Sequence, residues 1–267
     1  MKKYLSFFQL RFSMGLQYRT AAWAAVSTQF VWGCMEIMMF HAFYRANPAA
    51  FPMTLSAIAS YVWFQQAFLA LFAPWMLENE IFDGIMNGNI VYELCRPVAL
   101  YPMWFSRSVA LRLSRASLRC MPILIFATII PEPYGLTWPA SPAALAWFLL
   151  SLALSVLVVV AFGTIIYGLT FYTISPKGVK LFLTSLMEFF TGSIVPLPFL
   201  PAKLAAALEL LPFAAMQNVP LRVYSGDLSG QRLITAVSLQ VFWLIVLVTI
   251  GWLLCHYAQR HVTVQGG

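Results

Sequence analysis

The chain has 267 residues, of which 61% are hydrophobic and only 9% are charged. Ordinary soluble domains are about 45–50% apolar and about 25% charged. This composition, with a mean hydropathy of +0.79, excludes a soluble globular enzyme, a disordered chain and a disulfide scaffold, and it predicts an all-α integral membrane protein. The 16 basic residues outnumber the 9 acidic ones. In a membrane protein such an excess is first a signal of topology rather than of nucleic-acid binding.

The first 20 residues are predicted to form a helix that lies in the membrane interface. Its apolar residues recur at helical spacing and basic residues accompany them: Leu5, Phe8, Phe12 and Leu16, with Lys2, Lys3, Arg11 and Arg19. Such a helix places its apolar face among the acyl chains and its cations beside anionic headgroups. The alternative is a frayed cytoplasmic tail.

Six segments are apolar and long enough to predict transmembrane helices, since a span needs about 20 residues. They are residues 21–43, 55–76, 106–130, 143–172, 179–195 and 233–257. The third is unusual because Arg112, Arg115 and Arg119 lie within it. With both termini in the cytoplasm, 12 of the 16 Lys and Arg residues fall on the inner side. This asymmetry supports six spans with that orientation.

The cytoplasmic loop between the second and third spans, residues 78–105, is predicted to contact a soluble partner. Most of the acidic charge outside the membrane lies there, at Glu78, Glu80, Asp83 and Glu93. Apolar residues predict short amphipathic helices that glycine and proline interrupt: Ile81, Ile85, Ile90 and Leu94, with breaks at Gly84, Gly88 and Pro97. A short helix of this kind suits docking into a groove of a partner. The alternative is a solvated connector.

A proline-rich apolar stretch, residues 196–222, precedes the last span. Its prolines flank a helical run: Pro196, Pro198, Pro201, Pro212 and Pro220. Non-helical backbone at membrane depth persists only where protein buries it or where it lines an aqueous cavity. We therefore expect a re-entrant helical hairpin that dips into the outer leaflet.

Three charges are predicted to lie inside the membrane: Glu36, Arg119 and Glu188. A charge at the centre of a span costs roughly 2.5–3.5 kcal/mol on insertion scales. We therefore expect Arg119 to pair with Glu188 or with Glu36 in the protein interior. One alternative is that Arg119 reaches the cytoplasmic interface. Another is that one carboxylate stays free to attract a cationic cargo.

Two stretches resemble a known family. Asp83-Gly84, followed by Leu94, Arg96, Pro97 and Val98, resembles the cytoplasmic loop of ABC-2-type exporter permeases, in particular the daunorubicin-resistance-type branch. Residues 211–216, with Pro220, Leu221 and Arg222, are similar to that branch's region before the last span. The resemblance covers nearly the whole chain. It departs from the family at residues 87–89, Asn-Gly-Asn, where family members usually carry a longer acidic entry.

The resemblance implies that residues 1–267 form a single transmembrane domain in the bacterial cytoplasmic (inner) membrane. It implies the permease subunit of a multidrug-efflux-type exporter that moves a hydrophobic or amphipathic drug, lipid-like compound or peptide. Expected partners are a cytoplasmic nucleotide-binding ATPase subunit, a second permease that is identical or related, and membrane lipid, without nucleic acid. The residues expected to couple to the ATPase are Glu80, Asp83, Glu93 and Arg96. ATP and Mg²⁺ belong to that partner.

Catalytic signatures are missing from the sequence. It contains no G-x-x-x-x-G-K-[ST] phosphate loop, no H-E-x-x-H and no G-x-S-x-G, which are the motifs of nucleotide binding, zinc proteolysis and acyl hydrolysis. We therefore predict no enzymatic activity, cofactor or metal site in this chain. Two alternatives stay open: an ion-coupled transporter that uses Glu36 and Glu188, and an integral membrane lipid-processing protein.

Overall fold

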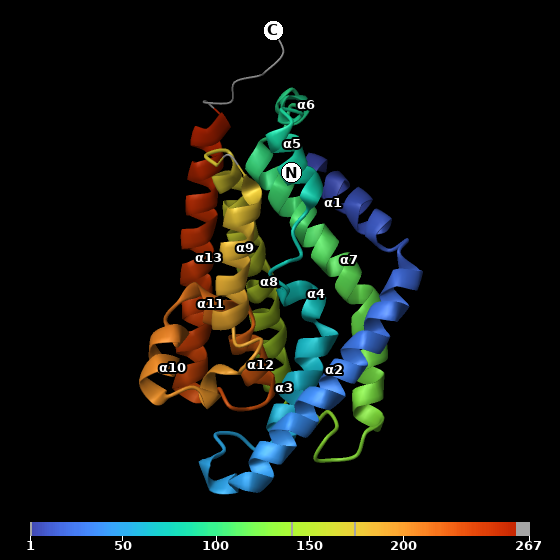
Figure 1. Ribbon diagram of the computed structural model, residues 1–267, viewed down its shortest axis with the longest axis vertical. Helices are drawn as coiled ribbons and strands as arrows, with labels where there is room; N and C mark the ends of the chain where they lie inside the picture. Colours follow the sequence, from blue (N-terminus) through green and yellow to red (C-terminus); the bar gives the residue numbers. More distant parts are fainter. Residues whose placement is uncertain (1, 140, 174, 260–267) are drawn as a thin grey trace.

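The computed structural model is all helical (Figure 1). It describes residues 2–139, 141–173 and 175–259, and within these ranges no β-strand occurs. Residues 260–267, the predicted cytoplasmic C-terminal end, lie outside the described part. The predicted all-α class is confirmed.

Two of the described helices are long and apolar enough to cross a membrane: α8 (Pro142–Thr170) and α13 (Gly230–Gln259). They pack side by side (Figure 1). In its most apolar window α8 is 61% buried, whereas α13 is only 22% buried. α13 therefore presents an apolar face to the outside of the molecule, and such a face marks contact with lipid or with a partner.

Two further helices have comparable length. α2 (Arg19–Ala46) has 28 residues and α7 (Leu100–Ile129) has 30, which corresponds to about 42 Å and about 45 Å at 1.5 Å per residue. Both are less apolar than α8 and α13, because α2 contains Glu36 and α7 contains several arginines.

The predicted second and fifth spans are shorter than expected. Residues 55–76 divide into α3 (Leu55–Ala67) and α4 (Leu69–Phe72), with a break at Phe68. α9 (Pro176–Phe190) has 15 residues, about 22 Å at the helical rise. Neither α3 nor α9 alone matches a hydrocarbon layer of about 30 Å. The six-span arrangement therefore stays a prediction.

α3 forms the centre of the bundle. It packs against α2, α7 and α12, and nearly all of its side chains are buried. The indole of Trp63, 1% exposed, donates a hydrogen bond of 2.8 Å to the carbonyl of Tyr134. Apolar burial all round the helix explains why its sequence shows no polar face.

The N-terminal helix α1 (Lys2–Gly15) ends earlier than predicted and packs along α7. The Tyr4 hydroxyl accepts a 3.0 Å hydrogen bond from the N–H of Ala99. A Cβ atom on Gly15 would lie 2.1 Å from the Ser114 hydroxyl, so only glycine allows this approach. Leu5 and Leu10 point away from the protein, which agrees with an apolar face available to lipid. The interfacial placement itself stays a prediction.

Residues 196–222 fold into short helices that begin at or near the prolines. They are η2 (Leu197–Phe199), α10 (Ala202–Glu209), α11 (Pro212–Met216) and α12 (Asn218–Tyr224). Proline is tolerated in a first helical turn because the N–H groups there lack intrahelical acceptors anyway. α11 and α12 are buried against α8 and α13. Their return into the bundle is compatible with a re-entrant hairpin, which stays a prediction.

Candidate functional site

The short helices α5 (Asn79–Met86) and α6 (Ile90–Leu94) project from one end of the bundle, opposite the end that carries α10 and α12 (Figure 1). We call residues 78–96 the acidic segment. Ile81, Phe82 and Ile90 are buried and hold it on the bundle. Gly84 lies within α5, so the predicted break there is wrong. Gly88, at φ +73°, makes the turn between the helices.

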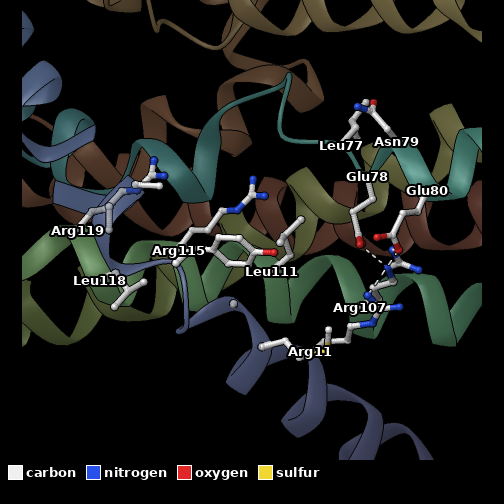
Figure 2. A pocket seen from close by; sticks show the side chains of 15 residues that line it. Arg11, Leu77, Glu78, Asn79, Glu80, Arg107, Leu111, Arg115, Leu118 and Arg119 are labelled. Carbon is white, nitrogen blue, oxygen red and sulfur yellow. Dashed lines mark hydrogen bonds and ion pairs between the residues drawn. The ribbon is translucent and has the colours of Figure 1, made fainter. Parts of the chain in front are cut away.

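The start of the acidic segment is anchored to α7 by a buried arginine. The Arg107 guanidinium forms ion pairs with Glu78 and Glu80 (Figure 2). The Arg107 side chain is 4% exposed and that of Glu78 is 10% exposed, whereas that of Glu80 is 73% exposed. Hydrogen bonding by Arg107 lowers the pKa of Glu80 below its usual value. At Glu78 two effects oppose each other: burial raises the pKa of the carboxyl and Arg107 lowers it. The effect of burial is larger, so the pKa of Glu78 is raised.

A second arginine of α7 holds the backbone that leads into the acidic segment. Arg112 is 2% exposed, and its guanidinium meets no carboxylate. It donates hydrogen bonds to four main-chain carbonyls, those of Ala70, Leu71, Ala73 and Met76. These carbonyls lie in α4 and in the turn after it, where helical partners are missing. Sequence patterns cannot predict this role, because the acceptors belong to the backbone.

The four residues predicted to couple to an ATPase divide into two pairs. Glu80 is bound to Arg107, and Glu93 accepts a 2.8 Å hydrogen bond from the indole N–H of Trp104. Asp83 and Arg96 are exposed. The exposed surface also contains Tyr92, 74% exposed, which no sequence motif singles out. Asp83, Tyr92 and Arg96 are therefore exposed, and Glu93 is held by Trp104. Glu80 is paired with Arg107, but its side chain stays 73% exposed.

A buried polar group, which we call the glutamine cluster, lies in the bundle at Glu36, Gln65, Gln66 and Gln217. The Glu36 carboxylate accepts hydrogen bonds from Gln65 Nε2 at 3.3 Å and from Gln66 Nε2 at 3.2 Å. Gln217 Nε2 donates to Gln65 Oε1 at 3.1 Å. The three glutamines are at most 6% exposed. Glu36 is thus partnered by amides rather than by a cation.

The predicted pairing of Arg119 with Glu188 or Glu36 is wrong for this chain. Arg119 forms no ion pair with any described residue, and its buried Nε atom has no hydrogen-bond partner. The reason is the position of the helices. Arg119 lies on the α7 face beside α1 and α2, whereas Glu188 lies on α9, which packs against α8 and α11.

The prolines of residues 196–222 have a structural role, since they lie at or near the starts of the short helices. A third buried arginine, Arg222, joins these helices. Arg222 in α12 forms ion pairs with Glu209 at the end of α10 and with Asp227 after α12. These pairs join α10, α12 and the connection to α13.

No group of three or more His, Cys, Asp or Glu side chains within the described ranges could hold a metal ion.

Comparison with models of protein families and with curated proteins finds no match to this chain.

Proposed function

We propose that this chain is the membrane-spanning permease subunit of an ATP-driven exporter of the ABC-2 type. It would move a hydrophobic or amphipathic molecule across a bacterial cytoplasmic membrane, powered by a separate nucleotide-binding subunit. The observation that carries the proposal is the acidic segment: two short helices, with charged and aromatic side chains exposed, projecting from one end of an apolar helical bundle. Short helices of this kind dock into grooves of soluble partners.

The two buried arginines of α7 supply a route for coupling. Arg107 ties the start of α5 to α7, and Arg112 ties α4 and the following turn to the same helix. A partner that pushes the acidic segment would move α7 with it, because breaking a buried ion pair by removing one partner costs about 3–5 kcal/mol. α7 in turn packs against α2, α3 and α8, so its displacement would reach the glutamine cluster.

A second permease is the partner that suits the exposed apolar faces. α2 exposes Trp32, Met38 and Phe43, and α13 exposes Phe242 and Ile245. Exposed apolar faces of this kind meet lipid or another apolar protein face. Two copies, or this chain and a related permease, would enclose the transport path between them.

The coupling surface is tested by reversing the charge of Asp83. We expect Asp83→Lys to weaken binding of the ATPase subunit at least tenfold, since like charges brought together at an interface cost several kcal/mol. Affinity for the purified ATPase and the stimulation of its ATP hydrolysis are the measurements. Glu132→Lys is the matched control, because Glu132 is an exposed carboxylate in the connection between α7 and α8, at the opposite end of the molecule (Figure 1).

Wild-type binding and stimulation in Asp83→Lys would remove the acidic segment from the coupling mechanism. Glu93 is left unchanged in this experiment, because it accepts a hydrogen bond from Trp104. Its replacement would mix an effect on folding with an effect on binding. Loss of both activities in the Glu132→Lys control would indicate a general effect of added positive charge.

One observation favours a second candidate, an ion-coupled transporter. Glu36 lies among glutamine amides and forms no ion pair with a described residue, and carboxylates within membrane spans mark ion and proton pathways. The two functions differ in their response to Glu36→Gln, which keeps the size of the side chain and removes its titratable group.

We expect Glu36→Gln to retain at least half of ATP-driven transport, because an amide can replace the carboxylate as an acceptor from Gln65 and Gln66. Transport into vesicles with and without an imposed pH gradient is the measurement, and Glu36→Leu is the control that removes the acceptor. Transport that needs the pH gradient and disappears in Glu36→Gln would establish ion coupling instead.

A further inference from the structure

A cavity of about 600 Å³ lies between α1, α2 and α7, beside the start of α5. Figure 2 shows Arg107, Arg115 and Arg119 along α7, and Arg11 of α1 beside Arg107. All three α7 residues line the cavity, and Arg115 and Arg119, four positions apart, share one face of the helix. The volume is in the range of about 300–1,000 Å³ that is typical of small-molecule sites.

The charges of this cavity do not balance. Four arginines and two glutamates line it, and both glutamates are already paired with Arg107. Arg11 reaches Glu80 only at 3.7 Å. Arg115 and Arg119 form no ion pair with any described carboxylate, and Arg119 Nε is buried without a hydrogen-bond partner. In Figure 2 the guanidinium groups of Arg115 and Arg119 extend from α7 in the same direction.

Two neighbouring cations with no protein counter-ion are costly at a partly buried site, because they repel each other and lose hydration. A bound anion removes both costs. Guanidinium groups bind phosphate in a bidentate fashion, through charge-assisted hydrogen bonds. The rest of the wall is largely apolar, with Met14, Ala22 and Leu118, so it suits the hydrocarbon part of an amphipathic molecule.

We propose that this cavity binds a phosphate group, held by Arg115 and Arg119. The phosphate would be carried by the headgroup of an anionic phospholipid or by a free phosphate compound. Arg107 is excluded as a main ligand because Glu78 and Glu80 occupy it. The proposal does not depend on ATP-driven transport, and its test involves no ATPase, so the two fail independently.

The test uses the purified full-length chain in detergent and three probes: short-chain phosphatidylglycerol, the corresponding diacylglycerol without phosphate, and inorganic phosphate. Native mass spectrometry counts bound lipid, and the thermal unfolding midpoint reports stabilisation. We expect phosphatidylglycerol to bind and diacylglycerol to bind much more weakly. Arg115→Gln/Arg119→Gln should weaken phosphatidylglycerol binding by roughly tenfold or more, because it removes charge-assisted hydrogen bonds.

Arg19→Gln is the matched control, since Arg19 is an exposed arginine at the start of α2 that does not line the cavity. It should leave binding unchanged. Should the double variant fail to fold, Arg119→Gln alone provides the comparison. If inorganic phosphate displaces phosphatidylglycerol, the site is assigned to free phosphate compounds. If it does not, the site is assigned to the lipid headgroup. The proposal is overturned if phosphatidylglycerol and diacylglycerol bind equally well. It is also overturned if Arg19→Gln weakens phosphatidylglycerol binding as much as the cavity variants do.

Discussion

Replacing Arg112 with methionine is expected to lower the free energy of unfolding by about 2–4 kcal/mol, because buried carbonyls left without a donor cost about 1–3 kcal/mol each. Methionine has a similar length and no donor. The carbonyls that lose their partner belong to Leu71, Ala73 and Met76. Part of this cost is offset, since burying a guanidinium is itself unfavourable. Denaturant titration of the detergent-solubilised chain, followed by tryptophan fluorescence, measures the change.

Arg115→Met is the matched control for this effect. Arg115 lies on the same helix, is half-buried and donates no hydrogen bond to a described residue. In the lipid-free and phosphate-free detergent-solubilised chain, its replacement should change the free energy of unfolding by less than about 0.5 kcal/mol, as is usual for partly exposed positions without a protein partner. Arg112→Lys should fall between the two, because an ammonium group cannot reach carbonyls in the fork geometry of arginine. Equal stability of Arg112→Met and Arg115→Met would show that Arg112 does not hold the backbone of residues 70–76.

The second large effect is expected at Arg107. Arg107→Met leaves Glu78 buried and unpaired, and removing one member of a buried ion pair costs about 3–5 kcal/mol. The loss should fall in the lower part of this range, because Glu80 is mostly exposed and can hydrate. The same titration measures it, and ATPase stimulation should fall with it because the start of α5 is released from α7.

The pH dependence of the stability of Arg107→Met shows whether the unpaired Glu78 carboxylate causes the loss. Without the guanidinium, burial raises the pKa of Glu78 still further above its unfolded value, so the folded variant binds the proton more tightly than the unfolded chain does. Its stability is then highest below the unfolded pKa and is lost as the pH rises through the folded pKa. The deficit of Arg107→Met relative to the wild type should therefore be smaller at pH 5 than at pH 8. Arg107→Met/Glu78→Gln should recover much of the loss at pH 8. A double variant that is as unstable as the single one would assign the effect to lost packing.

The long helices could be predicted closely from the sequence. The sequence predicts helices at residues 21–43, 143–172 and 233–257, and the structure has them at Arg19–Ala46, Pro142–Thr170 and Gly230–Gln259. A long apolar run determines a helix with little help from tertiary contacts, since every backbone group is satisfied within it. The location of the acidic segment at one end of the bundle follows from the same pattern.

The division of residues 55–76 was harder to predict. α4 ends before Pro74, because the residue before a proline disfavours the helical region, and Ala73 has a ψ of 119°. The break at Phe68 has no comparable signal. The freed carbonyls nearby are satisfied by Arg112, which lies 36 to 42 positions further along the chain. Hydrophobic patterning cannot show such a contact.

Polar partnerships were the main failure of the sequence argument. Insertion cost predicts partners for both Glu36 and Arg119, but among the described residues only Glu36 has them. Depth along each helix does not tell which face a residue occupies. Glu36 meets glutamines of α3, and Arg119 faces the cavity beside α1 and α2. Glu93 looked available for docking, yet it bonds to Trp104.

The central claim is that a nucleotide-binding subunit docks on the acidic segment, and site-specific photocrosslinking in intact cells tests it most directly. A photoreactive phenylalanine analogue replaces Tyr92, which is 74% exposed on α6, or, as the control, Trp138, which is 86% exposed in the connection between α7 and α8. We predict a crosslinked product from position 92 whose second component contains a phosphate-loop motif by mass spectrometry and hydrolyses ATP when purified. Position 138, at the opposite end of the molecule, should give no such product. Absence of a phosphate-loop protein from the position-92 product, or its equal capture from position 138, would contradict the claim.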